Sequence, residues 1–230
     1  MAISLFCAVI IKDAVSGLIE KFEAETGHIV EAKYDLNPLV KKRIDGGESF
    51  DVVIINPEMV DDLIAKGKVS AGSQTNIGCV EMGMAVHQKT DVSSFDTIDE
   101  FKSFLRSVSS IAYSSEGTSG KTFLGTLEKI GLLEELADRL KPVGEGQSGQ
   151  KVANGSVATA ALPKSIILAS PGLKVAGMFP NELQTRIYVA AGIRSDADDT
   201  KAAEQLVTFL SGHDSNETFA KKGIDRKIII

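Results

Sequence analysis

The chain has 230 residues, of which 43% are hydrophobic and 24% are charged, so it can bury a substantial core in one large domain or two modest lobes. The formal net charge of −6 and the lack of a basic run exclude nucleic acid as an expected partner. The longest apolar runs are strand-sized, so no direct membrane insertion is expected, and an anionic ligand would have to be held by local groups.

Cysteine and histidine usage argues against a metal centre. Cys7 and Cys79 are the only cysteines, and both fall in apolar, strand-like surroundings that predict buried structural thiols. The histidines at positions 28, 87 and 213 have no cysteine or carboxylate at ligand spacing. We therefore expect no metal and no cofactor.

The first residues do not read as a secretion signal. They contain no positively charged segment and no cleavage-site pattern before folded sequence begins. Two alternatives stay open: a cytoplasmic protein, or a protein whose leader was removed and replaced by a start methionine.

Strands and helices alternate almost from the first residue, which is typical of parallel sheets with helices on both faces. Up to residue 90 the pattern predicts strands over 3–9, 29–34, 51–56 and 80–87, a helix that ends before Gly27, and helices over 38–44 and 58–66.

The second part of the chain begins with a capping box, Thr97 to Glu100, that opens a helix. Beyond it the pattern predicts strands over 111–113, 157–162, 173–179 and 186–193, and helices over 123–130, 133–140, 150–153, 197–210 and 216–222.

The most informative stretch is Ser114–Thr122, a Gly- and Ser-rich turn between a strand and a helix expected to open near Thr122. Unpaired N–H groups and the helix dipole make such a turn an anion cradle. A phosphate-binding P-loop fails because Ser115 replaces its first glycine and Glu116 would repel a triphosphate. The other reading is a polar turn in which Thr118 and Ser119 cap the helix.

Three strand-to-helix junctions matter together, namely 8–13, 37–39 and 115–121. In open α/β sheets ligands bind beyond the carboxyl ends of the strands, where several helix N-termini can converge. This predicts a cleft between two lobes. The expected ligand contacts are Ile10, Ile11, Lys12, Asn37, Pro38, Asn56, Ser115, Thr118, Ser119, Gly120, Lys121, Ser148 and Lys164.

An ordered set of segments across the whole chain resembles a known family, the type II periplasmic solute-binding proteins, in their molybdate-binding-protein-like branch. The segments that carry the resemblance are 14–27, 43–54, 119–122, 127–132, 209–210 and 219–223. The resemblance implies an α/β fold of two lobes, 1–82 plus 187–230 and 83–186. It also implies a hinge near 78–84 and 184–188 that closes on a small anion.

The same resemblance implies a function. It suggests a monomeric, periplasmic receptor of an ABC-type transporter, with a permease as partner. Molybdate is disfavoured, because hydroxyl positions of molybdate binders fall here on Ile10, on Asn37 or Pro38, and on Leu162 or Pro163. Each unmatched oxygen would cost on the order of 1 kcal/mol or more. A carboxylate or another oxyanion held by backbone N–H groups is expected instead.

A second interpretation is an enzyme. The branch includes aconitate isomerases, and this chain shares their Gly-Glu-x-Phe-Asp segment and Ser-Gly loop. Allylic isomerisation of a small polycarboxylate needs a base and an enolate stabiliser. Glu116 and Lys121 are the expected catalytic pair, and Lys12 and Lys164 are further candidates.

Overall fold

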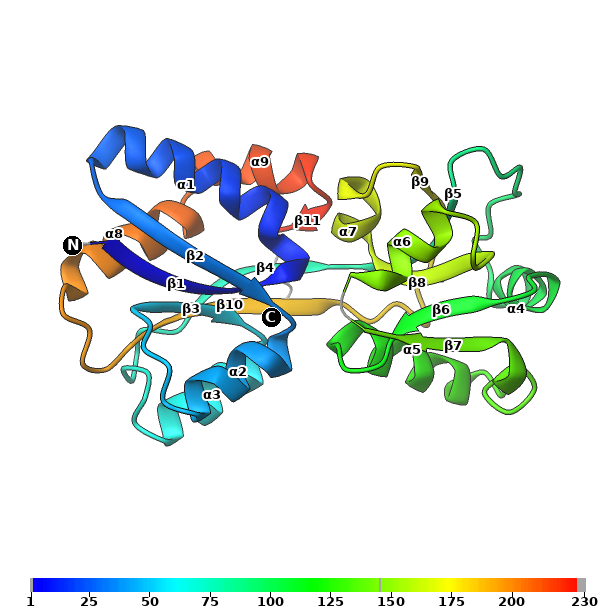
Figure 1. Ribbon diagram of the computed structural model, residues 1–230, viewed down its shortest axis with the longest axis horizontal. Helices are drawn as coiled ribbons and strands as arrows, with labels where there is room; N and C mark the ends of the chain where they lie inside the picture. Colours follow the sequence, from blue (N-terminus) through cyan, green and yellow to red (C-terminus); the bar gives the residue numbers. More distant parts are fainter. Residues whose placement is uncertain (1, 145, 227–230) are drawn as a thin grey trace. The chain divides into compact units, whose positions relative to one another are not determined.

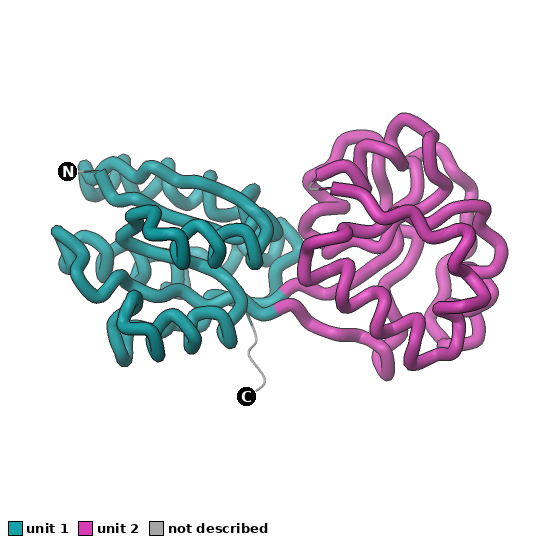
Figure 2. The backbone as a smooth tube through the Cα atoms, turned by 60° about the horizontal axis from the view of Figure 1, so that its bottom comes forward, with its two compact units in different colours: residues 1–79, 188–230 teal, residues 80–187 magenta. Residues whose placement is uncertain are grey.

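The computed structural model describes residues 2–144 and 146–226, and these residues form two compact units (Figure 2). Unit 1 consists of the described residues up to Cys79 and those from Tyr188 onward, whereas unit 2 is the continuous segment Val80–Ile187. Each unit has its own mixed sheet with helices on both faces. The expected two-lobed α/β class is therefore confirmed.

The sheet of unit 1 has the strand order β11-β4-β10-β3-β1-β2. Strand β1 runs parallel to both β2 and β3, and β10 lies antiparallel to β3. The strands are β1 (Ala2–Ala8), β2 (Ile29–Asp35), β3 (Val52–Ile55), β4 (Thr75–Val80), β10 (Ile187–Ile193) and β11 (Ile224–Asp225).

Helices cover both faces of this sheet (Figure 1). Helix α1 contacts both α8 and α9 on one face, and α2 and α3 lie on the other, over a core that includes Phe6, Val53 and Ile55. Their bounds are α1 (Lys12–Thr26), α2 (Asn37–Asp45), α3 (Pro57–Ala65), α8 (Thr200–Ser211) and α9 (Asn216–Lys221). Short 3-10 turns, η1 (Val9–Ile11) and η3 (His213–Ser215), precede α1 and α9.

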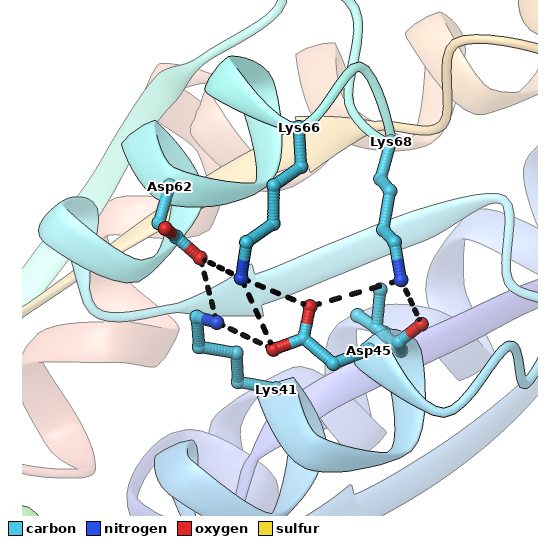
Figure 3. Close-up of polar contacts among 6 residues, drawn as sticks. Lys41, Asp45, Asp62, Lys66 and Lys68 are labelled. Atoms are coloured by element: carbon cyan, nitrogen blue, oxygen red, sulfur yellow. Dashed lines mark hydrogen bonds and ion pairs between the residues drawn. The ribbon is translucent and has the colours of Figure 1, made fainter.

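A charged cluster joins α2 to α3 (Figure 3). The ammonium nitrogen of Lys41 lies 2.6 Å from a carboxylate oxygen of Asp45 and 2.6 Å from one of Asp62. Lys66 pairs with the same two carboxylates, and Lys68 donates to the Ile44 carbonyl. The hydrogen bond from Lys41 holds the pKa of both carboxyls below their usual range. The cluster fastens the two helices to each other.

The sheet of unit 2 has the order β7-β6-β8-β5-β9, with β6 parallel to β7 and β8, and β5 antiparallel to β8. Its elements are β5 (Met82–His87), α4 (Ile98–Ser107), β6 (Ile111–Ser114), α5 (Thr118–Lys129), η2 (Ala137–Arg139), β7 (Leu140–Val143), α6 (Gln147–Ala153), β8 (Thr159–Pro163), α7 (Lys164–Ala169) and β9 (Leu173–Met178).

The two faces of this sheet are packed differently. On one face, the phenylalanine rings of α4 and α5 meet Phe95 and Phe179, with ring centroids 5.0 to 6.2 Å apart. On the other face, α6 and α7 cover a cluster of small side chains such as Ala112 and Ala160 (Figure 1). Helices α5 and α6 therefore lie on opposite faces of the same sheet.

The two units repeat one topology. In each, a central strand is followed by a helix and an edge strand, and then by a second helix and a third strand on the other side of the central one. The series β1-α1-β2-α2-β3 thus corresponds to β6-α5-β7-α6-β8. Because successive helices lie on opposite faces, each unit has a topological switch point at the carboxyl end of its central strand.

Several sequence predictions need correction. The helix after the Ser114–Thr122 stretch begins at Thr118 rather than near Thr122, with Gly117 as its N-cap, so Thr118 and Ser119 are not caps. The helix expected over 133–140 is instead a turn, the 3-10 segment η2 and the start of strand β7. Strand β4 was not expected. The capping box of Thr97 and Glu100 is confirmed.

Candidate functional site

In unit 2, the predicted ligand contacts gather at the carboxyl edge of three parallel strands. Strand β6 leads into α5, β7 into α6, and β8 into α7, and the register pairs Ser114 with Val143 and Ala112 with Ala160. Parallel strands in register end at one edge of the sheet. Residues 115–121, Ser148 and Lys164 therefore all lie at this edge.

Gly120 holds α5 against β6. A Cβ atom at this position would stand 1.7 Å from the carbonyl oxygen of Ser114, so no other residue fits without a shift of the backbone. The Ser114 hydroxyl, whose importance the sequence did not suggest, accepts the Gly117 N–H at 2.9 Å and fixes the turn before the helix. The glycine of the Ser-Gly loop is thus required by packing.

Two serines at this edge are almost buried, and their side chains have no hydrogen-bond partner in the part of the chain that the structure describes. Ser119 is 8% exposed and Ser148 is 4% exposed. Neither side chain makes a hydrogen bond to any residue that the structure describes, and neither oxygen is among the atoms sealed from solvent without a partner. Both hydroxyls therefore reach solvent at the sheet edge and are available to a ligand.

The charged residues at this edge are more open. Lys121 and Glu116 are exposed and Lys164 is half-buried, and within residues 2–144 and 146–226 none of them has an ion-pair partner. The Lys164 N–H donates to the Glu81 carbonyl at 2.9 Å. Ser115 is hydrogen-bonded to strand β7, since its hydroxyl and its N–H both donate to the Val143 carbonyl.

In unit 1, the corresponding edge begins with the turn between β1 and α1. The side chains of Ile10 and Ile11 are buried, with 8% and 1% exposure. The N–H of Lys12 donates to the Val9 carbonyl within the 3-10 turn, so it is already engaged. The side chains of Ile10 and Ile11 are apolar and buried, so they offer no polar group to a ligand.

The other two junctions of unit 1 are tied to each other. The side-chain oxygen of Asn37 accepts the Asn56 N–H at 3.2 Å, and the Asn56 amide donates to the Tyr188 carbonyl at 2.9 Å. Asn37 is not a helix cap, because Leu36 takes that position and Pro38 is the second residue of α2. Both asparagines are buried, and these bonds hold the ends of β2, β3 and β10 together.

Tyr34, which the sequence analysis did not single out, lies near the end of β2. The ammonium of Lys12 stands over its ring at 5.5 Å, and its hydroxyl lies 2.9 Å from that of Ser16. Burial raises the pKa of Tyr34 to about 12. Lys12 and Ser16 are one turn apart on α1, so a single aromatic ring fixes the first turn of that helix.

The described part of the chain has no group of three or more histidine, cysteine, aspartate or glutamate side chains that could hold a metal ion. None of the described helices combines the length and the apolar character that a membrane crossing requires.

The sequence is similar to one protein family and to a curated enzyme. The family described as bacterial extracellular solute-binding protein matches residues 3–225. Among curated proteins, an aconitate isomerase from a Pseudomonas species is 23% identical over 190 residues, which cover 83% of this chain and 72% of that protein.

Solved structures agree with the fold. A periplasmic molybdate-binding protein from Azotobacter vinelandii superposes with a TM-score of 0.83 at 18% identity, covering 96% of this chain and 98% of that chain. The substrate-binding domain of a molybdenum ABC transporter protein from Clostridium difficile gives 0.78 at 15% identity, covering 99% of each chain. The resemblance to molybdate-binding-like solute-binding proteins is confirmed.

Proposed function

We propose that this chain, which belongs to the bacterial extracellular solute-binding protein family, binds a small anion as the receptor of an ABC-type transporter. The observation that carries the proposal is that the nearly buried side chains of Ser119 and Ser148, at one sheet edge, have no hydrogen-bond partner among the described residues. Both hydroxyls reach solvent and make no hydrogen bond to the described residues, so a ligand oxygen could pair with them.

The electrostatics of the edge fit an anion. Lys121 and Lys164 carry positive charge there without an ion-pair partner among the described residues, and Ser119 lies in the first turn of α5, where the helix dipole is positive. The chain as a whole has a formal net charge of −6. Attraction to an anion must therefore come from this local group.

We further propose that the two connections near 78–84 and 184–188 act as a hinge. A permease is the expected partner, and the family description supports a location outside the cytoplasm. The receptor is expected to act as a monomer.

A thermal-shift screen followed by calorimetry tests the proposal. The probes are sulfate, phosphate, molybdate, and small mono-, di- and tricarboxylates. Ligand at one hundred times its Kd should stabilise the protein by about 2.7 kcal/mol, which corresponds to roughly 5–10 °C for a chain of this size. If none of these anions shifts the transition, the proposal is wrong.

A second candidate is an isomerase of a small polycarboxylate, which the 23% identity to an aconitate isomerase favours. Glu116 and Lys121 are exposed at the edge that carries the free serines, where a proton could be taken up and an enolate stabilised. Incubation with cis- and with trans-aconitate, followed by ultraviolet absorbance, tests this candidate. Interconversion that is lost in Glu116→Gln supports it, and a rate equal to buffer eliminates it.

A further inference from the structure

Helix α6 ends at Asn154-Gly155, the one place in the chain where glycine follows asparagine. Asn154 is the C-cap of the helix, and Asn154, Gly155 and Ser156 are all exposed. Gly155 has a φ of 76°, in the left-handed region that strains most other residues. The turn therefore requires a glycine next to a solvent-accessible asparagine amide.

The side chain of Asn154 lies in an Asx turn. Its Oδ1 atom accepts the Ser156 N–H at 3.0 Å, so the side chain runs alongside the backbone that follows it. This hydrogen bond also polarises the amide carbonyl and makes Cγ more susceptible to a nucleophile. Because Gly155 has no Cβ atom, no side chain on that residue hinders an approach of its own backbone nitrogen to Cγ.

One hydrogen bond holds that nitrogen back. The Gly155 N–H donates to the Val152 carbonyl at 3.1 Å, and the ψ angle of Asn154 is 2°. An attack on Cγ requires this N–H to be released and the ψ angle to rotate. The bond closes the last turn of a seven-residue helix at the surface, and such helix ends open at little cost in free energy. The reactive geometry is therefore reached by local fraying of α6, without unfolding of the rest of the chain.

We infer that Asn154 is a site of spontaneous deamidation. Hydroxide removes the proton of the Gly155 nitrogen, which then attacks Cγ of Asn154. The N–Cγ bond forms and the Cγ–Nδ2 bond breaks, and the nitrogen leaves as ammonia after taking a proton from water. Water then opens the five-membered succinimide at either carbonyl, which gives aspartate or isoaspartate at position 154.

The other five asparagines lack this combination of features. Asn37 and Asn56 each precede a proline, whose nitrogen has no proton to lose. A residue with a side chain follows each of the remaining three. Asn181 is the matched comparison among them, because it is as accessible as Asn154 by class of exposure and precedes an exposed glutamate, Glu182.

Deamidation changes the charge at the end of α6. The product carries a carboxylate at the C-terminus of the helix, where the helix dipole is already negative. Lys151 lies three residues earlier, at the spacing at which side chains of a helix are neighbours, and its ammonium can balance the new charge. The modified chain therefore has one more negative charge than the parent, whatever ligand the protein binds.

Incubation of the full chain in mildly alkaline buffer tests the inference. Samples taken at intervals are digested at acidic pH, which stops the reaction, and the peptides are mapped by mass spectrometry. We expect the peptide with Asn154 to gain the mass of an amide-to-acid conversion at least about tenfold faster than the peptide with Asn181. The rate should rise with pH, because hydroxide generates the nucleophile.

Two variants complete the test. Asn154→Gln should abolish the conversion at this position, because a glutamine would have to close a less favourable six-membered ring. Gly155→Asp keeps a residue that tolerates a positive φ but adds a side chain beside the nucleophile, and should slow the conversion about tenfold. Conversion of Asn154 no faster than that of Asn181, or an unchanged rate in Gly155→Asp, would overturn the inference.

Discussion

The side-chain amide of Gln184 pairs with the backbone of Met82 as a neighbouring strand would. Its oxygen accepts the Met82 N–H at 2.8 Å, and its nitrogen donates to the Met82 carbonyl at 3.0 Å. Met82 is fully buried and begins strand β5. Both residues fall in the segments where the sequence predicted a hinge, so one side chain fastens the two connections together.

The variant Gln184→Ala should therefore destabilise unit 2. The Met82 carbonyl keeps the Phe179 N–H as a donor, but the Met82 N–H loses its acceptor. We expect a loss of about 1–3 kcal/mol in urea unfolding. Gln88→Ala, which truncates an exposed glutamine, is the control and should change stability by less than about 0.5 kcal/mol. Equal stability of the two variants would contradict the prediction.

Gly120→Ala should be poorly tolerated, because the new methyl would collide with the Ser114 carbonyl. We expect destabilisation of at least about 1–3 kcal/mol, the usual cost of overpacking. Helix α5 supplies its own control in Gly125, where a Cβ meets nothing within 4 Å. Gly125→Ala should stabilise the protein by about 0.5–1 kcal/mol. Thermal unfolding of both variants would test the contrast, and similar effects would refute it.

Asn37→Ala should show that the junctions of unit 1 are tied together. The substitution removes the acceptor of the buried Asn56 N–H, with an expected loss of about 1–3 kcal/mol. Asn181→Ala is the comparison, since Asn181 is exposed. Chemical denaturation of both proteins measures the difference. If Asn37→Ala is as stable as Asn181→Ala, water replaces the lost acceptor, and the hydrogen bond between Asn37 and Asn56 does not stabilise the protein.

The capping box of α4 predicts a pH effect. Hydrogen bonds from the Asp96 and Thr97 N–H groups hold the pKa of Glu100 below its usual range. Since the folded pKa is the lower one, the stabilisation is present above the unfolded value of about 4.3 and is lost as the pH falls through the folded pKa. Glu100→Gln should flatten the stability profile in that acidic window. Glu128→Gln, which removes an exposed carboxylate, should not.

The charged cluster of α2 and α3 predicts a salt effect. Lys41→Met leaves the carboxylates of Asp45 and Asp62 close together with one cation fewer, and should cost up to about 1 kcal/mol in dilute buffer. The loss should shrink in 1 M NaCl, where the screening length is about 3 Å. Lys42→Met makes the same charge change on the same helix at an exposed lysine. Melting curves of both variants in dilute buffer and in 1 M NaCl would separate the loss of the ion pairs from the change in net charge.

The strands and helices with clear periodicity could be predicted from sequence, as could the two-lobed class. The failures have physical causes. Leu133, Leu136 and Leu140 are spaced like a helix face, but the last of them begins strand β7, whose pairing with β6 completes the sheet. Pro142 is tolerated there because β7 is an edge strand.

The candidate site was predictable in part. Strand-to-helix junctions can be recognised from sequence, and all predicted contacts do lie at such junctions or in the first turn after them. Which polar groups are free could not be predicted, because that depends on contacts between distant residues. The Asn37 side-chain oxygen accepts from Asn56 and the Asn56 amide donates to Tyr188, whereas the Ser148 hydroxyl has no hydrogen-bond partner among residues 2–144 and 146–226.

The interrupted sequence of unit 1 has a consequence for biosynthesis. Strand β10 fills the position between β4 and β3, yet it is translated after the whole of unit 2. Until it emerges, the sheet of the N-terminal segment lacks an interior strand and cannot close, while the continuous unit 2 already has every strand it needs. The ribosome therefore completes the second unit first, and the earliest residues are expected to remain the longest in an incompletely folded, chaperone-accessible state.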